Sequence, residues 1–266
     1  MISVLNSPSL YSSLFSVVDF CKQNDGEEVN IIVPDKLSLF MEKFLFEQLN
    51  ISASFDIKIN TLNRFAKRNC DVDSDKQISK TGSLLLIHRV LNENIEKFKT
   101  FRSKAYSFSY AENIFNTISQ LKASKINPNE MENFVSGNDE LNDKIHDLAL
   151  VYKAYEDLKA GLLDSSDVFL MSAFTVSNGL NNAKILFVGF DDFTAVEYTI
   201  IERLAEGNNV YVINQKSNGS NKYIFNNEME TQLKNIAYVN NFPFKVEKLG
   251  EYGSDLKKFL QKFFRL

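Results

Sequence analysis

The chain has 266 residues, 44% of them apolar, and its 30 basic and 34 acidic residues give a net charge of −4. This composition suits one or two packed domains, and it argues against a strongly basic duplex-binding domain and against a cysteine-rich metal protein. No apolar run is long enough to cross a membrane and no signal peptide begins the chain, so we expect a cytoplasmic protein with no membrane partner and no metal site.

The first part of the chain alternates short β-branched runs with apolar residues at helical spacing. Strands are expected at Ile2 to Leu5, Val29 to Val33 and Asp56 to Ile59, and the helices after the second and third strands at Lys36 to Leu49 and Leu62 to Lys67. Thr61 is the expected N-cap of the last helix. This order predicts an α/β fold with a parallel sheet and flanking helices.

The middle of the chain loses the strand pattern, which predicts an all-helical insertion at residues 71–180. Helices are expected at Ser83 to Leu91, Tyr110 to Lys122 and Leu141 to Lys159, with turns at Asn127-Pro128-Asn129 and Ser136 to Asp139. We therefore predict one α/β domain from residues 1–70 and 181–250, interrupted by the helical domain. Residues 251–266 are apolar and basic and are expected to begin a following segment or to mark a truncated end.

The pattern returns to strands and helices after the insertion. Strands are expected at Ile185 to Val188 and Val210 to Ile213, helices at Val196 to Leu204 and Glu228 to Asn240, and a loop at Asn214 to Asn221. The sheet is thus predicted to resume where the insertion ends.

The turn after the first strand has the place of a phosphate-binding loop but not its residues. In the pattern G-x-x-x-x-G-K-[ST], Asn6 and Tyr11 fall on the glycines, Ser12 on the lysine and Ser13 on the hydroxyl residue. The missing ammonium leaves the phosphate charge without compensation. We predict a degenerate nucleotide site and no bound cofactor; the alternative interpretation is an ordinary capped helix.

Six blocks in order resemble the N-terminal part of AddB (RexB), the second subunit of the bacterial AddAB helicase–nuclease that processes double-strand breaks. They are IIVPDKLSLFMEKFLFEQL, INTLNRFAKR, SKTGSLLLIHRVL, ISQLKASKINPNEM, LNDKIHDLALVYKAYEDLKAGLLDSSDVF and VGFDDFTAVEYTIIERL. The resemblance implies a superfamily 1 helicase 1A-like domain of the P-loop NTPase fold with a helical 1B-like insertion. It also implies DNA and an AddA-type subunit as partners, and ATP with Mg²⁺ in the parent family. The nuclease domain of that family would lie beyond Leu266.

In superfamily 1 helicases, the strand after the insertion ends in two acids that act on Mg²⁺ and water. The positions that align with these acids are Val188 and Gly189, and the acids Asp191 and Asp192 come later. We interpret the two aspartates as caps of the following helix; the alternative is a displaced metal role.

The INTLNRFAKR segment corresponds to a helicase motif that contacts single-stranded DNA. The predicted contact residues are Asn60, Thr61, Asn63, Arg64, Lys67 and Arg68. The alternative is a capped helix with a solvated basic face. A second candidate surface is the basic and aromatic run Lys97 to Tyr110, for which the alternative is a connection between helices with buried aromatic rings.

The leading hypothesis is a helicase-like module that binds single-stranded or forked DNA, has no catalytic residue of its own and does not hydrolyse ATP. A second hypothesis is a scaffold that docks an AddA-type motor subunit without touching DNA. A third is that the chain is a fragment of an active ATP-dependent helicase–exonuclease subunit.

Overall fold

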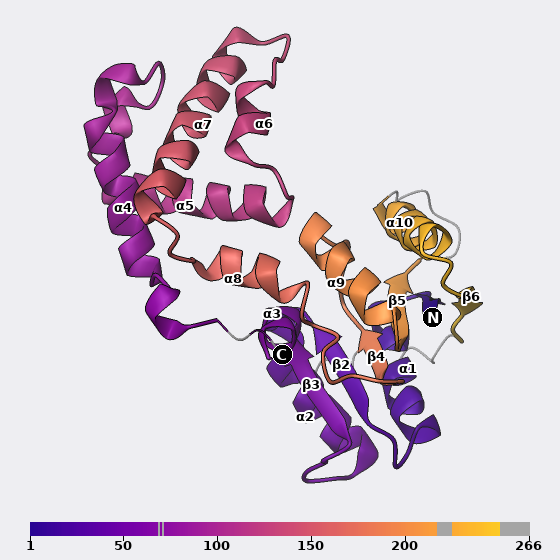
Figure 1. The fold of residues 1–266 in the computed structure, drawn as a ribbon. Coiled ribbons are helices and arrows are strands. Elements are labelled where there is room, and N and C mark those ends of the chain that lie inside the picture. Colours follow the sequence, from indigo (N-terminus) through magenta and orange to yellow (C-terminus); the bar gives the residue numbers. More distant parts are fainter. Residues whose placement is uncertain (69, 71, 217–224, 251–266) are drawn as a thin grey trace, which may run out of the picture. The chain divides into compact units, whose positions relative to one another are not determined.

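The computed structural model describes residues 1–68, 70, 72–216 and 225–250. The chain divides into two compact units (Figure 1). The sheet unit consists of Met1–Asn69, Phe174–Phe193 and Glu197–Leu266, and the helical unit consists of Cys70–Ala173 with Thr194–Val196. The predicted segment 251–266 and most of the predicted loop, residues 217–221, lie outside the described residues.

The sheet unit is built on one parallel sheet with the strand order β3-β2-β4-β5-β1-β6. The strands are β1 (Ile2–Ser7), β2 (Val29–Val33), β3 (Ile57–Thr61), β4 (Lys184–Phe187), β5 (Asn209–Gln215) and β6 (Phe244–Lys248). Ile2 pairs with Val210 on one side and with Phe244 on the other. The predicted parallel, helix-flanked sheet is confirmed, whereas β6 was not predicted.

Helices follow the strands as the apolar spacing predicted. They are α1 (Leu10–Gln23), the 3-10 turn η1 (Asp35–Leu37), α2 (Ser38–Leu49), α3 (Leu62–Lys67), α9 (Ala195–Ala205) and α10 (Phe225–Val239). Helices α1 and α2 pack with alternate strand residues such as Ile31 and Leu186 in one core, while α10 packs on β1, β5 and β6. All five residues of β2 are buried, as expected for a strand in a sheet that is covered on both faces.

The helical unit contains α4 (Lys80–Glu93), α5 (Phe108–Ala123), α6 (Pro128–Glu132), α7 (Asp139–Lys159) and α8 (Ser165–Ser172), with 3-10 turns η2 (Ser74–Lys76), η3 (Ile95–Lys97) and η4 (Arg102–Lys104). Its own core joins α4, α5 and α7. The predicted turn at Asn127-Pro128-Asn129 is wrong, because Asn127 caps α6 in a capping box with Glu130 and Pro128 takes the first helical position. None of the helices in the described ranges is long and apolar enough to span a bilayer.

Candidate nucleotide and nucleic-acid sites

The turn after β1 is a tight helix cap. Strand β1 ends at Ser7 and α1 begins at Leu10, so two residues connect them. The Ser9 Oγ accepts a hydrogen bond from the Ser12 N–H at 3.1 Å, and the Ser13 hydroxyl donates to the Ser9 carbonyl at 2.9 Å. Ser12 and Ser13 are both fully buried. The hydroxyl at the position of the magnesium ligand is therefore engaged with the backbone of the cap.

The carboxyl end of β1 is held by the chain's own polar side chains. The Asn6 amide donates to the Glu230 carboxylate of α10 at 3.2 Å and accepts from the Asn214 amide at 3.1 Å. The Lys216 ammonium lies 3.4 Å from the same Glu230 oxygen. The Tyr11 ring packs along α1 against its neighbouring phenylalanine. A protein carboxylate thus lies where β1 ends.

The loop after β4 has no acid at the two aligned positions. Val188 is buried and its N–H donates to the Ile32 carbonyl at 2.9 Å. Gly189 has a φ of +80°, and a Cβ there would lie 2.5 Å from the Leu37 Cδ1. The backbone at Gly189 therefore requires glycine, both for its dihedral angle and for its approach to η1.

The predicted capping role of Asp191 and Asp192 is wrong. Helix α9 begins at Ala195, so neither aspartate occupies its N-cap position. The Asp192 carboxylate instead accepts a hydrogen bond from the Tyr198 hydroxyl at 2.7 Å. Burial, together with this carboxylate, raises the pKa of Tyr198 above its ordinary value. Asp192 consequently holds the loop to the first turn of α9 through a side chain.

The sheet brings the two halves of the predicted nucleotide site to one edge. The carboxyl ends of parallel strands share an edge, so the turn after β1 and the loop after β4 lie on the same side. Strand β5 separates β1 from β4, which sets the strand ends roughly 10 Å apart.

The predicted DNA-contact residues lie at the same edge, where the edge strand β3 enters α3. The predicted N-cap and helix bounds are confirmed, since the Thr61 hydroxyl accepts from the Arg64 N–H at 3.3 Å. Asn63, Arg64 and Arg68 are exposed, while Phe65 packs inward. Asn60 and Lys67 are half-buried, and Thr61 is buried. The exposed polar groups of this site are therefore on the surface of α3.

The second predicted surface, Lys97 to Tyr110, divides into two parts. Phe98 and Phe101 are buried in the core of the helical unit, as the alternative interpretation expected. Tyr106 is 72% exposed and Phe108 46% exposed.

A buried carboxylate that the sequence did not reveal holds this segment. Asp147 of α7 is fully buried and accepts from the N–H groups of Lys99, Thr100 and Phe101 at 3.0, 2.7 and 3.0 Å. Burial alone would raise the pKa of Asp147, but the three N–H donors hold it below its usual value. Asp147 therefore fixes the backbone of the connection between α4 and α5.

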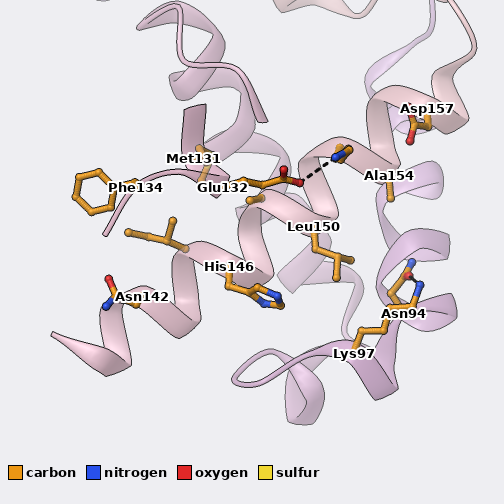
Figure 2. A pocket seen from close by; sticks show the side chains of 13 residues that line it. Asn94, Lys97, Met131, Glu132, Phe134, Asn142, His146, Leu150, Ala154 and Asp157 are labelled. Atoms are coloured by element: carbon orange, nitrogen blue, oxygen red, sulfur yellow. Dashed lines mark hydrogen bonds and ion pairs between the residues drawn. The ribbon is translucent and has the colours of Figure 1, made fainter. Parts of the chain in front are cut away.

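A cavity of about 440 Å³ opens beside α6 and α7 of the helical unit (Figure 2). The Lys153 ammonium and the Glu132 carboxylate pair across its wall at 3.0 Å. It is lined by Asn94, Lys97, Met131, Glu132, Phe134, Asn142, Ile145, His146, Ala149, Leu150, Lys153, Ala154 and Asp157. No residue of the predicted nucleotide or DNA sites lines this cavity.

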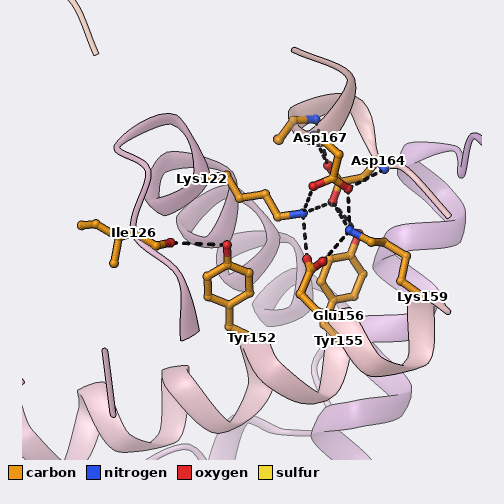
Figure 3. Close-up of polar contacts among 9 residues, drawn as sticks. Lys122, Ile126, Tyr152, Tyr155, Glu156, Lys159, Asp164 and Asp167 are labelled. Atoms are coloured by element: carbon orange, nitrogen blue, oxygen red, sulfur yellow. Dashed lines mark hydrogen bonds and ion pairs between the residues drawn. The ribbon is translucent and has the colours of Figure 1, made fainter. Parts of the chain in front are cut away.

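Five charged side chains form a buried ion network where α5, α7 and α8 meet (Figure 3). The Lys122 ammonium lies 2.7 Å from carboxylate oxygens of Glu156, Asp164 and Asp167. The Lys159 ammonium lies 2.8 Å from Glu156 and 2.5 Å from Asp167. The three carboxylates are close enough together to hold a metal ion, but the two ammonium groups already pair with their oxygens. The cluster is therefore an ion network that joins three helices.

The ion network shifts the titration of two of its members. Burial alone would raise the pKa of Asp164, but the Lys122 ammonium lowers it to about 2. Burial alone would lower the pKa of Lys122, but hydrogen bonds to Asp164, Asp167 and Glu156 raise it. Asp164 and Lys122 consequently stay charged at neutral pH.

Comparisons with known proteins agree on one family. The model of the family described as "ADDB, N-terminal" matches residues 14–261. Curated relatives, named as the B subunit of ATP-dependent helicase/deoxyribonuclease, include those of Pediococcus pentosaceus, 25% identical over 74% of this chain and 18% of the relative, and Listeria welshimeri, 26% identical over 66% and 16%. The relative from Clostridium novyi is 25% identical over 70% of this chain and 17% of its own length. The matched region thus spans less than a fifth of each relative. Because the family model covers nearly the whole sequence, the chain belongs to the AddB N-terminal family.

Proposed function

We propose that this chain is a helicase-like DNA-binding module of an AddB-type helicase–nuclease subunit, acting in double-strand break repair without hydrolysing ATP. In this proposal the sheet unit is a 1A-like domain, the helical unit is a 1B-like insertion, and the partners are DNA and an AddA-type motor subunit. The parallel sheet and the names of the relatives support it.

The absence of ATP hydrolysis rests on the two strand ends where nucleotide chemistry would occur. A phosphate loop needs bare N–H groups and an ammonium, whereas the turn after β1 has two residues and Ser12 replaces the lysine. Magnesium and the attacking water need carboxylates, whereas Val188 and Gly189 offer none. Micromolar binding of ATP with Mg²⁺ in calorimetry would contradict this part of the proposal.

The observation that carries DNA binding is the exposure of Asn63, Arg64 and Arg68 on α3, at the carboxyl end of an edge strand. Two guanidinium groups and an amide can donate to successive phosphates, and the Thr61 cap fixes the helix that presents them. Cations on a capped helix bind a backbone without reading its sequence. The module would hold a strand rather than move it.

The test is a paired substitution on α3. Arg64→Ala with Arg68→Ala should weaken binding of a labelled single-stranded oligonucleotide and lower the slope of log affinity against log salt by roughly 1.4, since about 0.7 is lost per phosphate contact on a single strand. Arg203→Ala is the matched control, because Arg203 is exposed on α9 and pairs with Glu206. Equal affinities for all three proteins would overturn the DNA part of the proposal.

A second candidate function is a scaffold that docks the AddA-type motor subunit and does not touch DNA. The net charge of −4 favours it, because a phosphate backbone repels an acidic surface. Copurification with the motor subunit, together with no salt-dependent retention of the oligonucleotide, would select this function. Either function is compatible with a parent protein that is an active ATP-dependent helicase–exonuclease subunit, since the matched region is less than a fifth of each relative.

A further inference from the structure

The helical unit carries an exposed aromatic patch formed by Leu85 and His88 of α4 with Tyr106 and Phe108 at the start of α5. Leu85 is 57% exposed, Tyr106 72% and Phe108 46%. The rings of His88 and Phe108 lie 5.8 Å apart between centroids, and the His88 Nε2 lies 3.3 Å from the Tyr106 carbonyl oxygen. Leu85 is one helical turn before His88, so the four side chains share one face. These contacts thus join two segments that the sequence separates.

The charge around this aromatic patch is positive, on a chain whose net charge is negative. From Lys97 to Tyr110 the sequence has four cations and no acid: Lys97, Lys99, Arg102 and Lys104. The Lys104 ammonium lies 5.8 Å from the centroid of the Tyr110 ring, and Arg102 pairs with Glu96. Rings that alternate with cations are typical of surfaces that hold single-stranded nucleic acid by base stacking.

The rings are also fixed before any ligand arrives. The connection that carries them is anchored by Phe101 in the core and by the bonds of its backbone to Asp147. Ser107 caps α5 through a hydrogen bond from the Tyr110 N–H at 3.3 Å. A ring that is held in place loses little conformational freedom when a base stacks on it.

We infer that the aromatic patch is a stacking platform for the bases of single-stranded nucleic acid, with Lys104 and Arg102 meeting the neighbouring phosphates. This surface is separate from α3, and the inference shares with the proposed function the premise that the chain binds a single strand. A docking site for an apolar, acidic protein segment would use the same rings, and the experiment separates the two.

The experiment compares a thymidine oligonucleotide with an abasic strand of equal length, by fluorescence anisotropy on the full chain. Tyr106→Ala with Phe108→Ala should weaken binding of the thymidine strand roughly 5- to 150-fold for each ring that stacks and leave the abasic strand unaffected. Tyr106→Phe should retain affinity because the ring remains. Lys104→Ala should instead weaken both strands and lower the salt slope by roughly 0.7.

Phe134→Ala is the matched control, since Phe134 is 54% exposed elsewhere in the helical unit. The inference is overturned when the paired alanine variant folds and binds the thymidine strand as tightly as the unsubstituted chain, or when Phe134→Ala causes an equal loss. Loss of motor-subunit binding with intact strand affinity also overturns it and assigns the aromatic patch to a protein. If the α3 variant alone loses binding, the proposed function stands and the stacking platform falls; if only the aromatic variant loses binding, the reverse holds.

Discussion

Lys122 is 6% exposed, and its ammonium group meets three carboxylates, so its charge is balanced by neighbours rather than by water. Lys122→Met should lower the free energy of unfolding by about 3–5 kcal/mol, because three buried or half-buried carboxylates then share one lysine. Glu156→Gln is the control: it leaves two cations with two anions and should cost less than about 1 kcal/mol. Urea unfolding at neutral pH measures both variants.

The same ion network gives a pH dependence with a definite sign. The pKa of Asp164 falls from 3.8 to about 2 in the folded chain, so its contribution to stability is complete above 3.8 and is lost as the pH falls through about 2. In Lys122→Met the carboxylates lose a cation and their pKa values rise. The stability deficit of this variant should therefore shrink between pH 7 and pH 4. A deficit that stays constant across that range would show that charge repulsion is not its cause.

Asp147 tests a different use of a buried carboxylate, since its partners are backbone N–H groups. Asp147→Asn places an amide NH₂ against at least one of these donors and should lower the free energy of unfolding by about 3 kcal/mol. Asp143→Asn, one turn earlier on α7, removes an exposed carboxylate that pairs with Lys99 and should cost less than about 1 kcal/mol. Equal losses in chemical denaturation would mean that the bonds to the connection do not matter.

At the scale of elements, Gly189 joins the loop after β4 to η1. Gly189 and Gly26 have nearly the same dihedral angle, with φ of +80° and +78°, but only at Gly189 would a Cβ meet another side chain, the Leu37 Cδ1 at 2.5 Å. Gly26→Ala should thus report the backbone cost alone, about 1 kcal/mol, and Gly189→Ala should cost more. Adding Leu37→Ala should cancel the excess if the contact is its source. Thermal unfolding of the four variants checks this.

The elements that the sequence predicted are those with an unambiguous period. Val29 to Val33 is an unbroken β-branched run, and the structure has β2 at those residues. Strand β6 was missed because its residues, Phe244–Lys248, alternate apolar with charged residues at an exposed edge, where burial does not select apolar side chains. Helix α6 was missed because Asn-Pro marks turns and helix starts alike; Glu130, three residues after Asn127, is the signal that separates the two.

The sites divide in the same way. The turn after β1 and the α3 cap are local, so spacing along the chain was enough to place Ser12, Ser13 and Thr61. The ion network is not local, since Lys122 and Asp164 are 42 residues apart. One signal was available: Lys122 continues the apolar face of α5 one turn after Ile118, which predicts a buried lysine but not its partners. The aromatic patch likewise needed His88 and Tyr106 to be brought together by folding.

At the scale of the whole molecule, the connectivity predicts which parts fold alone. In the sheet order, β4 and β5 lie between β2 and β1, so neither residues 1–69 nor residues 174–250 contain a contiguous set of strands. The helical unit has its own core, and its two ends are joined to each other. The Ile78 N–H donates to the Leu163 carbonyl at 3.0 Å, and the Leu163 N–H donates to the Lys76 carbonyl at 2.7 Å.

Residues 70–173 expressed alone should therefore give a helical protein that unfolds in one cooperative transition, with far-UV and near-UV circular dichroism changing together. Residues 1–69 and 174–250 should each remain unfolded alone, because most of the strand pairs of either piece are made with the other. Lys122→Met supplies the internal control, since it should lower the denaturation midpoint of the isolated helical unit as it does in the full chain. A fragment 70–173 without a cooperative transition would mean that the helical unit depends on the sheet, and the two would then have to be treated as one folding unit.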